Sequence, residues 1–265
     1  MAITTLDGIV AGLIQPSSFL KNGAATVVGR GYSPFFVAGR PGAAVAPTPG
    51  LTGAALTTYA GQIPWTNPAA GNSYLARLSG AANVAGRLRL CDRLWHNSGI
   101  VVTSTASQSI NSVAFPARDR SGVTNGEDIF IGAEVSTVMG AGTPTWTMGY
   151  TNSAGTAGRS IVTAAQTATM AVGSFIELPL AAGDIGVRSI QTWQQSATMT
   201  TGVYHLVAYR VLAEMEISLA NIGTQLDAIA CGFPRLFDNT VPFLTWLPST
   251  TTAPVLSGSI NFAQG

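Results

Sequence analysis

Charge is what this sequence has least of. Thirteen Lys and Arg residues and twelve Asp and Glu residues make up 9% of the 265-residue chain, whereas about 25% is usual for a soluble domain. Lys21 is the only lysine, and the arginines are scattered along the chain. Because a nucleic-acid binder needs clustered cations to displace the counterions of the phosphate backbone, we expect no nucleic-acid partner.

Long apolar runs and reactive side chains are also scarce. Although hydrophobic residues make up 46% of the chain, no run reaches the roughly 18 apolar residues that a membrane-spanning helix needs, so we expect no membrane partner. The N-terminal residues lack the basic region of a secretory signal, which predicts synthesis in the cytoplasm. Cys91 and Cys231 are too few for a disulfide framework, and we expect them to be reduced and buried.

A surface with so few charges is poorly suited to a free monomer, because charge keeps proteins dispersed. We therefore expect other subunits to cover part of this surface and the chain to form a homo-oligomer.

The first 83 residues are predicted to be a short helix followed by an extended arm. Thr5 can cap a helix that ends before Pro16 and carries an apolar stripe of Leu6, Ile9, Val10, Leu13 and Ile14. Residues 21–83 are rich in Gly, Ala, Pro and Thr and have no sustained period, which favours extended chain. Their aromatic side chains require burial, so we expect the arm to lie in grooves of its own body or of a neighbouring subunit.

Residues 84–265 are predicted to be the body, an all-β, antiparallel β-sandwich of jelly-roll type. Short segments rich in β-branched and aromatic residues alternate there with Gly, Asn and Asp turns. We expect the strand near residue 211 to continue to Ile217 rather than to become a helix. The predicted strands are 84–90, 99–105, 109–116, 129–135, 145–151, 174–180, 187–193, 202–211, 243–247 and 255–262.

The densest reactive cluster, Cys91-Asp92-Arg93-Leu94-Trp95-His96, supplies three metal donors in Cys91, Asp92 and His96. A closed metal site needs four ligands, so we interpret the cluster as a strand end with a buried cysteine and an Arg–Asp pair. His96 and His205 are the only histidines, and no Gly-x-Ser-x-Gly motif is present. We predict no catalytic, cofactor-binding or metal residues, and that the protein is not an enzyme.

Three other readings stay open. Cys91 with His205 is a conceivable nucleophile and base, and Asp119, Glu127 and Asp128 supply oxygen ligands that Ca²⁺ prefers. The carboxylates of the body also satisfy the count that a β-sandwich hydrolase or lyase requires, although nothing in the sequence specifies a pair.

Three segments resemble virion structural proteins of tailed bacteriophages, of the minor capsid or head decoration type. They are 90–100 (LCDRLWHNSGI), 111–135 (NSVAFPARDRSGVTNGEDIFIGAEV) and 144–160 (PTWTMGYTNSAGTAGRS), and the resemblance extends over about residues 85–215. It implies a non-enzymatic protein that attaches to an assembled capsid or tail, located in the virion.

These observations predict a structural virion protein that cements or decorates a capsid through subunit contacts. Its partners would be the major capsid protein or other virion subunits, with a trimer favoured by analogy with capsid three-fold axes. The alternative is a tail- or surface-located module that recognises host glycans by stacking sugars on Trp146, Tyr150, Trp193 and Tyr204. The predicted interface residues are Leu6, Ile9, Leu13, Phe19, Tyr32, Phe35, Phe36 and Trp65.

Overall fold

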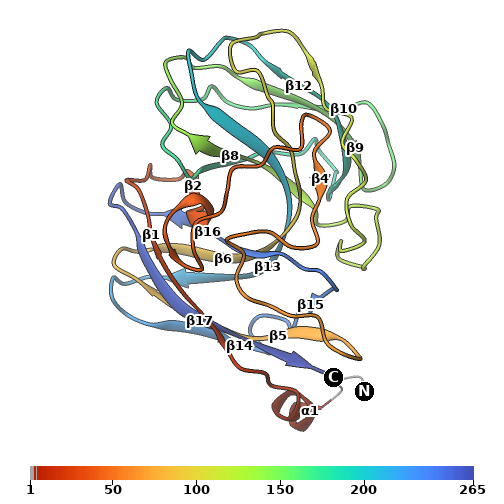
Figure 1. Ribbon diagram of the computed structural model, residues 1–265, viewed down its shortest axis with the longest axis vertical. Coiled ribbons are helices and arrows are strands. Elements are labelled where there is room, and N and C mark those ends of the chain that lie inside the picture. The colour runs from red at the N-terminus through yellow and green to blue at the C-terminus, as the bar shows by residue number, and fades with distance from the viewer. Residues whose placement is uncertain (1–2, 4) are drawn as a thin grey trace. The chain divides into compact units, whose positions relative to one another are not determined.

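The computed structural model describes residues 3 and 5–265 and is built from antiparallel strands (Figure 1). The predicted class, an antiparallel all-β sandwich, is confirmed. In chain order the elements are α1 (Leu6–Ala11), β1 (Ser17–Asn22), β2 (Gly31–Tyr32), the 3-10 turn η1 (Pro34–Phe36), β3 (Gly39–Arg40), β4 (Ala54–Ala55), β5 (Ser73–Ala82), β6 (Gly86–His96), β7 (Gln108–Ser109), β8 (Phe130–Thr137), β9 (Trp146–Asn152), β10 (Arg159–Val162), β11 (Ser174–Glu177), β12 (Val187–Gln195), β13 (Val203–Ile217), β14 (Thr224–Asp227), β15 (Arg235–Leu236), β16 (Pro242–Pro248) and β17 (Val255–Gln264).

The chain divides into two compact units. Unit 1 comprises the described part of Met1–Val45 together with Thr57–Asp92 and Val211–Gly265, and unit 2 comprises Ala46–Leu56 and Arg93–Arg210. The chain passes from one unit to the other inside two strands, after Asp92 in β6 and after Arg210 in β13. Each unit has its own hydrophobic core.

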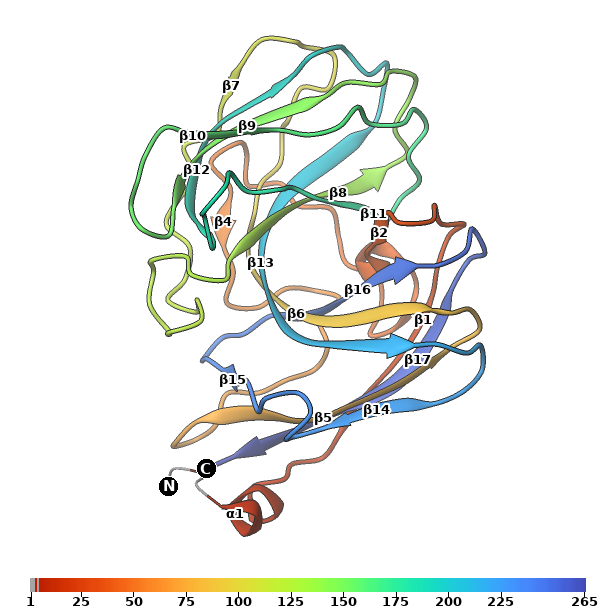
Figure 2. The same ribbon diagram turned by 180° about the vertical axis from the view of Figure 1, so that it is seen from behind.

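Unit 1 is organised by a sheet in which the last strand lies between two early ones. The strand order is β14-β5-β17-β1-β3, and β15 also pairs with β5 (Figure 2). Ile260 of β17 pairs with Leu78 of β5 on one side and with Ser17 of β1 on the other. Leu78 and Ile260 are fully buried. A second ladder in this unit pairs β16 with the first part of β6, placing Trp246 opposite Leu88.

Unit 2 contains the sheet β10-β9-β12-β7, the antiparallel strands β8 and β11, and the part of β13 up to Arg210. Burial along β9 alternates strictly, and its inward side chains Trp146, Met148 and Tyr150 are fully buried. Trp146 lies against Trp193 of β12, with ring centroids 5.4 Å apart, and against Tyr204 of β13, 4.9 Å apart. Aromatic side chains from three strands therefore fill the centre of this core.

The structure differs from the predicted division at residue 83. Strand β5 lies in the segment predicted to be an extended arm, yet it is an interior strand of the unit 1 sheet, paired with both β17 and β14. Its sequence, SYLARLSGAA, hides the alternation because several inward positions are small residues. Strand β1 is likewise part of that sheet. Backbone pairing thus joins much of residues 1–83 to unit 1, and neither unit begins at residue 84.

Two predicted strands are wrong. Residues 99–105 form no strand, because the side-chain amide of Gln108 satisfies both the N–H and the C=O of Val101. Residues 109–116 are strand only at Ser109, because the backbone turns at Asn111, where φ is 41°. The strand predicted to continue to Ile217 is confirmed as β13.

We expect Gly258→Ala to destabilise the protein by about 1–3 kcal/mol, the usual cost of overpacking a closely packed site. A Cβ at this position in β17 would lie 2.1 Å from the carbonyl oxygen of Ser79 and 2.5 Å from Cζ of Phe19. Gly223→Ala is the matched control, because a Cβ there meets no atom within 4 Å. Urea unfolding midpoints measure both changes, and equal midpoints for the two variants would contradict the described ladder.

Candidate attachment surface

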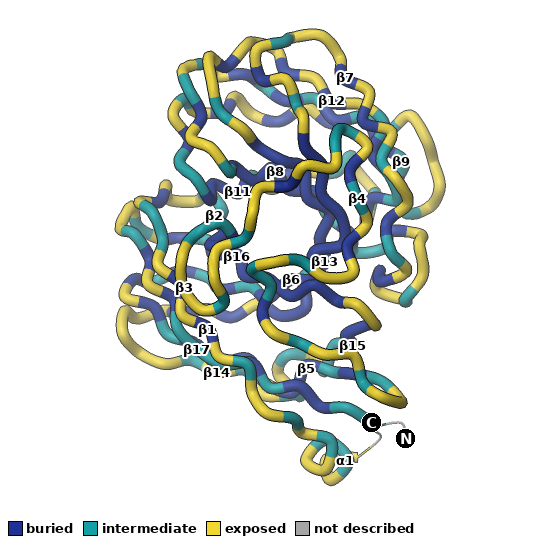
Figure 3. Tube along the Cα trace, in the orientation of Figure 1, coloured by how far each residue is buried: buried dark blue, intermediate teal, exposed yellow. Residues whose placement is uncertain are grey.

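Helix α1 presents apolar side chains that unit 1 leaves exposed. Its N-cap residue Thr5 accepts a hydrogen bond from the N–H of Gly8 at 3.0 Å. No residue of the helix is buried (Figure 3), and the exposed fractions are 65% for Leu6 and 67% for Val10. The stripe predicted from the spacing of apolar residues therefore exists, and among the described residues Leu6, Val10 and Leu13 are exposed while Ile9 and Ile14 are half-buried.

Strand β17 holds α1 in place through the backbone that follows the helix. Leu13, itself 46% exposed, forms a β-bridge with Ala263. The N–H of Ile14 donates to the carbonyl of Phe262 at 3.1 Å, and the N–H of Gln264 donates to the carbonyl of Gly12 at 2.8 Å. The exposed stripe is thus attached to an interior strand of the sheet rather than to a loose tail.

A pocket of about 400 Å³ opens between α1 and the segment 228–233. Its walls include Leu6, Ile9, Ile229 and Phe233. Phe233 stacks on Tyr74 of β5 with ring centroids 4.5 Å apart, and Ile229 is 77% exposed. We call the exposed residues Leu6, Val10, Leu13 and Ile229, together with the half-buried Ile9, the α1 surface. Its side chains and the adjoining pocket together offer uncharged, apolar area to a partner.

The other predicted interface residues lie elsewhere in unit 1. Phe19, Tyr32 and Phe35 are 2%, 3% and 2% exposed. Phe19 and Tyr32 belong to the core of this unit, and Phe35 packs against Phe243 with ring centroids 5.8 Å apart. In this conformation these three side chains are buried by contacts within their own chain. Phe36 and Trp65 are half-buried, and an interface role for them stays a prediction.

The surface has fewer charges than the composition implies. All 25 charged side chains belong to residues that the structure describes, and seven of them are buried: Lys21, Asp92, Arg93, Arg118, Asp119, Glu134 and Arg210. Lys21 donates from Nζ to the carbonyls of Val37 and Gly42 at 3.1 Å each, and burial lowers its pKa to about 8.

Several of the remaining charges neutralise each other on the surface. Arg87 pairs with Glu214 and Glu216 at 3.0 Å each, and Arg89 also pairs with Glu214. These pairs offset part of the surface charge that would otherwise oppose the burial of neighbouring surface in an interface.

The cluster at Cys91–His96 becomes two separate sets of contacts. In unit 1, Asp92 accepts a hydrogen bond from the N–H of Val241 at 2.9 Å, and the Cys91 thiol lies 3.9 Å from the hydroxyl of Thr245. In unit 2, Arg93 pairs with Glu134 at 2.6 Å, and both side chains are fully buried. The predicted Arg–Asp pair is replaced here by an Arg–Glu pair between β6 and β8.

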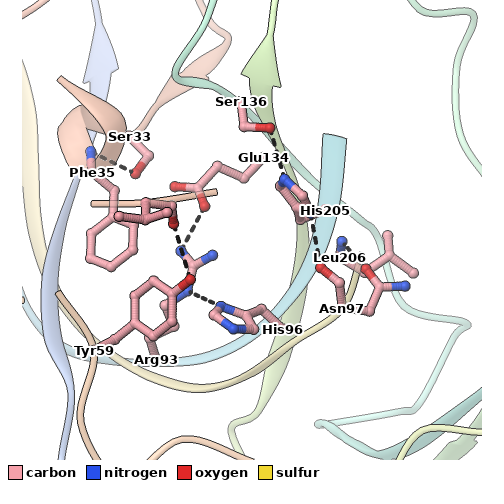
Figure 4. A network of polar contacts seen from close by, with 11 residues as sticks. Ser33, Phe35, Tyr59, Arg93, His96, Asn97, Glu134, Ser136, His205 and Leu206 are labelled. Carbon is pink, nitrogen blue, oxygen red and sulfur yellow. Dashed lines mark hydrogen bonds and ion pairs between the residues drawn. The ribbon is translucent and has the colours of Figure 1, made fainter. Parts of the chain in front are cut away.

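Both histidines of the chain lie in this unit 2 network (Figure 4). The Nε of Arg93 lies 3.3 Å from Nδ1 of His96. Nδ1 of His205 lies 2.9 Å from the carbonyl oxygen of Asn97, and Nε2 lies 2.7 Å from the hydroxyl of Ser136. A carbonyl only accepts hydrogen bonds, so Nδ1 carries the proton and Nε2 accepts from Ser136.

Burial keeps both imidazoles neutral. Desolvation, with the nearby Arg93 and His205, lowers the pKa of His96 to about 2. Desolvation also lowers the pKa of His205 to about 4, with Arg93 adding to the effect and the hydrogen bond to Asn97 opposing it. The network is a buried, hydrogen-bonded support for β6, β8 and β13.

The remaining sequence candidates occupy structural positions. Asp119 is 1% exposed, and its carboxylate accepts from the N–H groups of Ser121, Val123 and Gly126. Cys91 is buried and belongs to unit 1, whereas His205 belongs to unit 2. Both cysteines are free thiols, as predicted, but Cys231 is only partly buried.

The aromatic residues proposed to stack sugars are in the core of unit 2. Trp146, Tyr150, Trp193 and Tyr204 are all fully buried, so that part of the glycan hypothesis is wrong. Inward positions of β9, β12 and β13 account for their burial.

Two features are absent from residues 3 and 5–265. No group of three or more His, Cys, Asp or Glu side chains in that part of the chain is placed to hold a metal ion. No helix formed by those residues has the length and hydropathy to cross a membrane.

The comparisons with known proteins yield weak likenesses. No family model and no curated protein matches the chain. Among solved structures, the VP2 subviral particle of infectious bursal disease virus has a TM-score of 0.21 and 10% identity over 95% of this chain and 80% of that chain. T=1 particles derived from infectious bursal virus give 0.19 and 10%, covering 96% and 79%. The T13 particle of the same virus gives 0.19 and 9%, covering 96% and 78%. TM-scores this low carry no argument about this chain.

We expect the free energy of unfolding to fall as the pH is lowered from 7 to 5. Unfolded histidines take up protons near pH 6.5, whereas the folded His96 and His205 stay neutral until far lower pH. The loss is about 2 kcal/mol for each histidine at pH 5. Urea titrations at several pH values measure it. The slope should halve in His205→Gln and disappear in His96→Gln/His205→Gln, and an unchanged slope in the double variant would contradict it.

We expect Glu134→Gln to cost about 3–5 kcal/mol, because it leaves the Arg93 guanidinium buried beside a neutral group. Glu216→Gln is the control, since its pair with Arg87 is largely exposed and such pairs contribute at most about 1 kcal/mol. Denaturant unfolding measures both. Equal losses in the two variants would show that the buried pair is not the support described.

Proposed function

We propose that this chain is a structural protein of a virion, which attaches to an assembled capsid and cements or decorates it through subunit contacts. The observation that carries the proposal is the α1 surface, an exposed apolar stripe held to the unit 1 sheet in a chain whose surface has few free charges. Protein interfaces are depleted of charge at their centre and enriched in apolar side chains. Repeated attachment across a particle adds avidity to individually weak contacts.

The finer assignment, a head decoration protein of a tailed bacteriophage, rests on the resemblance of residues 85–215. The partners are then the major capsid protein or other virion subunits, in a homo-oligomer for which a three-fold axis suits a trimer. Such a protein is not an enzyme and needs no cofactor.

The double variant Leu6→Glu/Val10→Lys tests the proposal. Glutamate in the first turn and lysine in the last turn suit the helix dipole, so α1 is retained while the stripe becomes charged. The net charge of the chain is unchanged. We expect at least a tenfold drop in the number of copies per particle, counted by quantitative electrophoresis of purified particles, because each attachment buries two charges.

Val138→Glu/Val162→Lys is the matched control. These unit 2 residues are 52% and 60% exposed, and we expect normal occupancy. Deleting residues 1–40 is a poorer test, because it removes β1, Phe19 and Tyr32 from unit 1. Full occupancy of Leu6→Glu/Val10→Lys would overturn the proposed role of the α1 surface.

A further inference from the structure

A pocket of about 310 Å³ opens within unit 2, where three loops meet, and its lining combines polar groups with a larger apolar surface. The loops contribute residues 125–127, 152–154 and 183–185. Pockets that bind small molecules begin at about 300 Å³, so this one has room for one or two sugar rings. It is separate from the α1 surface, which belongs to unit 1.

A buried carboxylate organises one side of this pocket. The side chain of Asp184 is 4% exposed and accepts hydrogen bonds from the Tyr150 hydroxyl at 2.5 Å, Nδ2 of Asn152 at 2.6 Å and Nε of Arg159 at 2.8 Å. These bonds, led by those from Arg159 and Tyr150, lower the pKa of Asp184 to about 2. The loop at 183–185 is therefore tied to the β9–β10 hairpin.

The loop that carries Asn125 and Glu127 is held in the same way by Asp119 and by its neighbours. The N–H of Asp128 donates to the carbonyl of Ile185 at 3.1 Å, and the N–H of Ser153 donates to the carbonyl of Gly186 at 2.9 Å. Gly126 and Gly186 approach so closely that a Cβ on Gly186 would lie 2.0 Å from the carbonyl oxygen of Gly126. All three walls are thus fixed before any ligand arrives, which reduces the entropy lost on binding.

The lining favours a ligand that both donates and accepts hydrogen bonds. The Glu127 carboxylate accepts, and the Asn125 side-chain NH₂ donates. The Ser153 hydroxyl does both, and it makes no hydrogen bond to any residue in the described part of the chain. Ile185, 58% exposed, adds apolar contact at the rim.

The charges around the pocket balance. Arg159 pairs with Asp184, and Arg120 lies 3.5 Å from Asp128 and 4.0 Å from Glu127. Arg188 donates to the side-chain oxygen of Asn125. Three acidic and three basic side chains surround the opening, so the site has no net field that would select an ion.

We propose that this pocket binds a neutral saccharide, through its hydroxyl groups. A sugar ring carries donors and acceptors at several positions and no charge, which matches the lining. The inference does not depend on the attachment function, because it uses only unit 2 residues. Binding of a single sugar is expected in the millimolar range, and repetition over a particle would raise its avidity.

Ligand-observed NMR with galactose, glucose, mannose and N-acetylglucosamine, each at about 10 mM, tests the inference on the full chain, with sialic acid as the charged comparison. We expect saturation transfer to at least one neutral sugar. Ala154→Trp should abolish it, because Ala154 is an exposed lining residue and the indole fills the pocket. Glu127→Gln should weaken it at least threefold, because it exchanges a charged acceptor for a neutral one.

Glu177→Gln, the same substitution at an exposed position of β11, is the control and should bind as the parent chain does. Unfolding midpoints verify that each variant folds. Transfer to no neutral sugar, transfer to sialic acid alone, or transfer that persists in Ala154→Trp would each overturn the inference. The number of copies of Ala154→Trp per particle is measured in parallel. This number reports on the attachment proposal alone, so a failure of sugar binding can be distinguished from a failure of attachment.

Discussion

The ladder that β17 forms with β1 and β5 is the interaction on which unit 1 depends. It pairs residues 255–264, which form the last strand of the chain, with the strands formed by residues 17–22 and 73–82. Closing such long loops has a large entropic cost, and burial of the apolar face offsets it, with Phe19, Leu78 and Ile260 at its centre. The position of α1 follows from the same ladder, because β17 bonds to the backbone at Gly12 and Ile14.

Sequence reasoning predicted the structure correctly where the local residue pattern of a segment determines its conformation. The alternation in β9 and the length of β13 are visible in the chain, and so is the apolar spacing of α1. It failed where contacts with a segment distant in the sequence determine the conformation. The small residues of β5 become an interior strand only because β17 and β14 flank them, and residues 99–105 lose their strand to the single side chain of Gln108.

The candidate sites divide in the same way. The stripe on α1 could be predicted, but the pocket beside it could not, since Ile229 and Phe233 lie more than 200 residues away in the sequence. The histidine network and the loop pocket were also beyond reach, because each brings together segments far apart along the chain. Predicted interface residues such as Phe19 and Phe35 are apolar for another reason, which is that unit 1 needs them in its interior.

The use of charge connects these features. This chain has few ionisable groups, and it buries seven of them, several of which hold backbone or another charge in place: Asp119 caps a loop, Lys21 binds two carbonyls, and Glu134 supports Arg93. Desolvating a charge is costly unless it is paired or hydrogen-bonded, and these groups serve structural rigidity rather than solubility. A surface left largely neutral in this way can be covered by another protein, or can offer hydroxyl-binding groups to a sugar, without first stripping water from exposed ions.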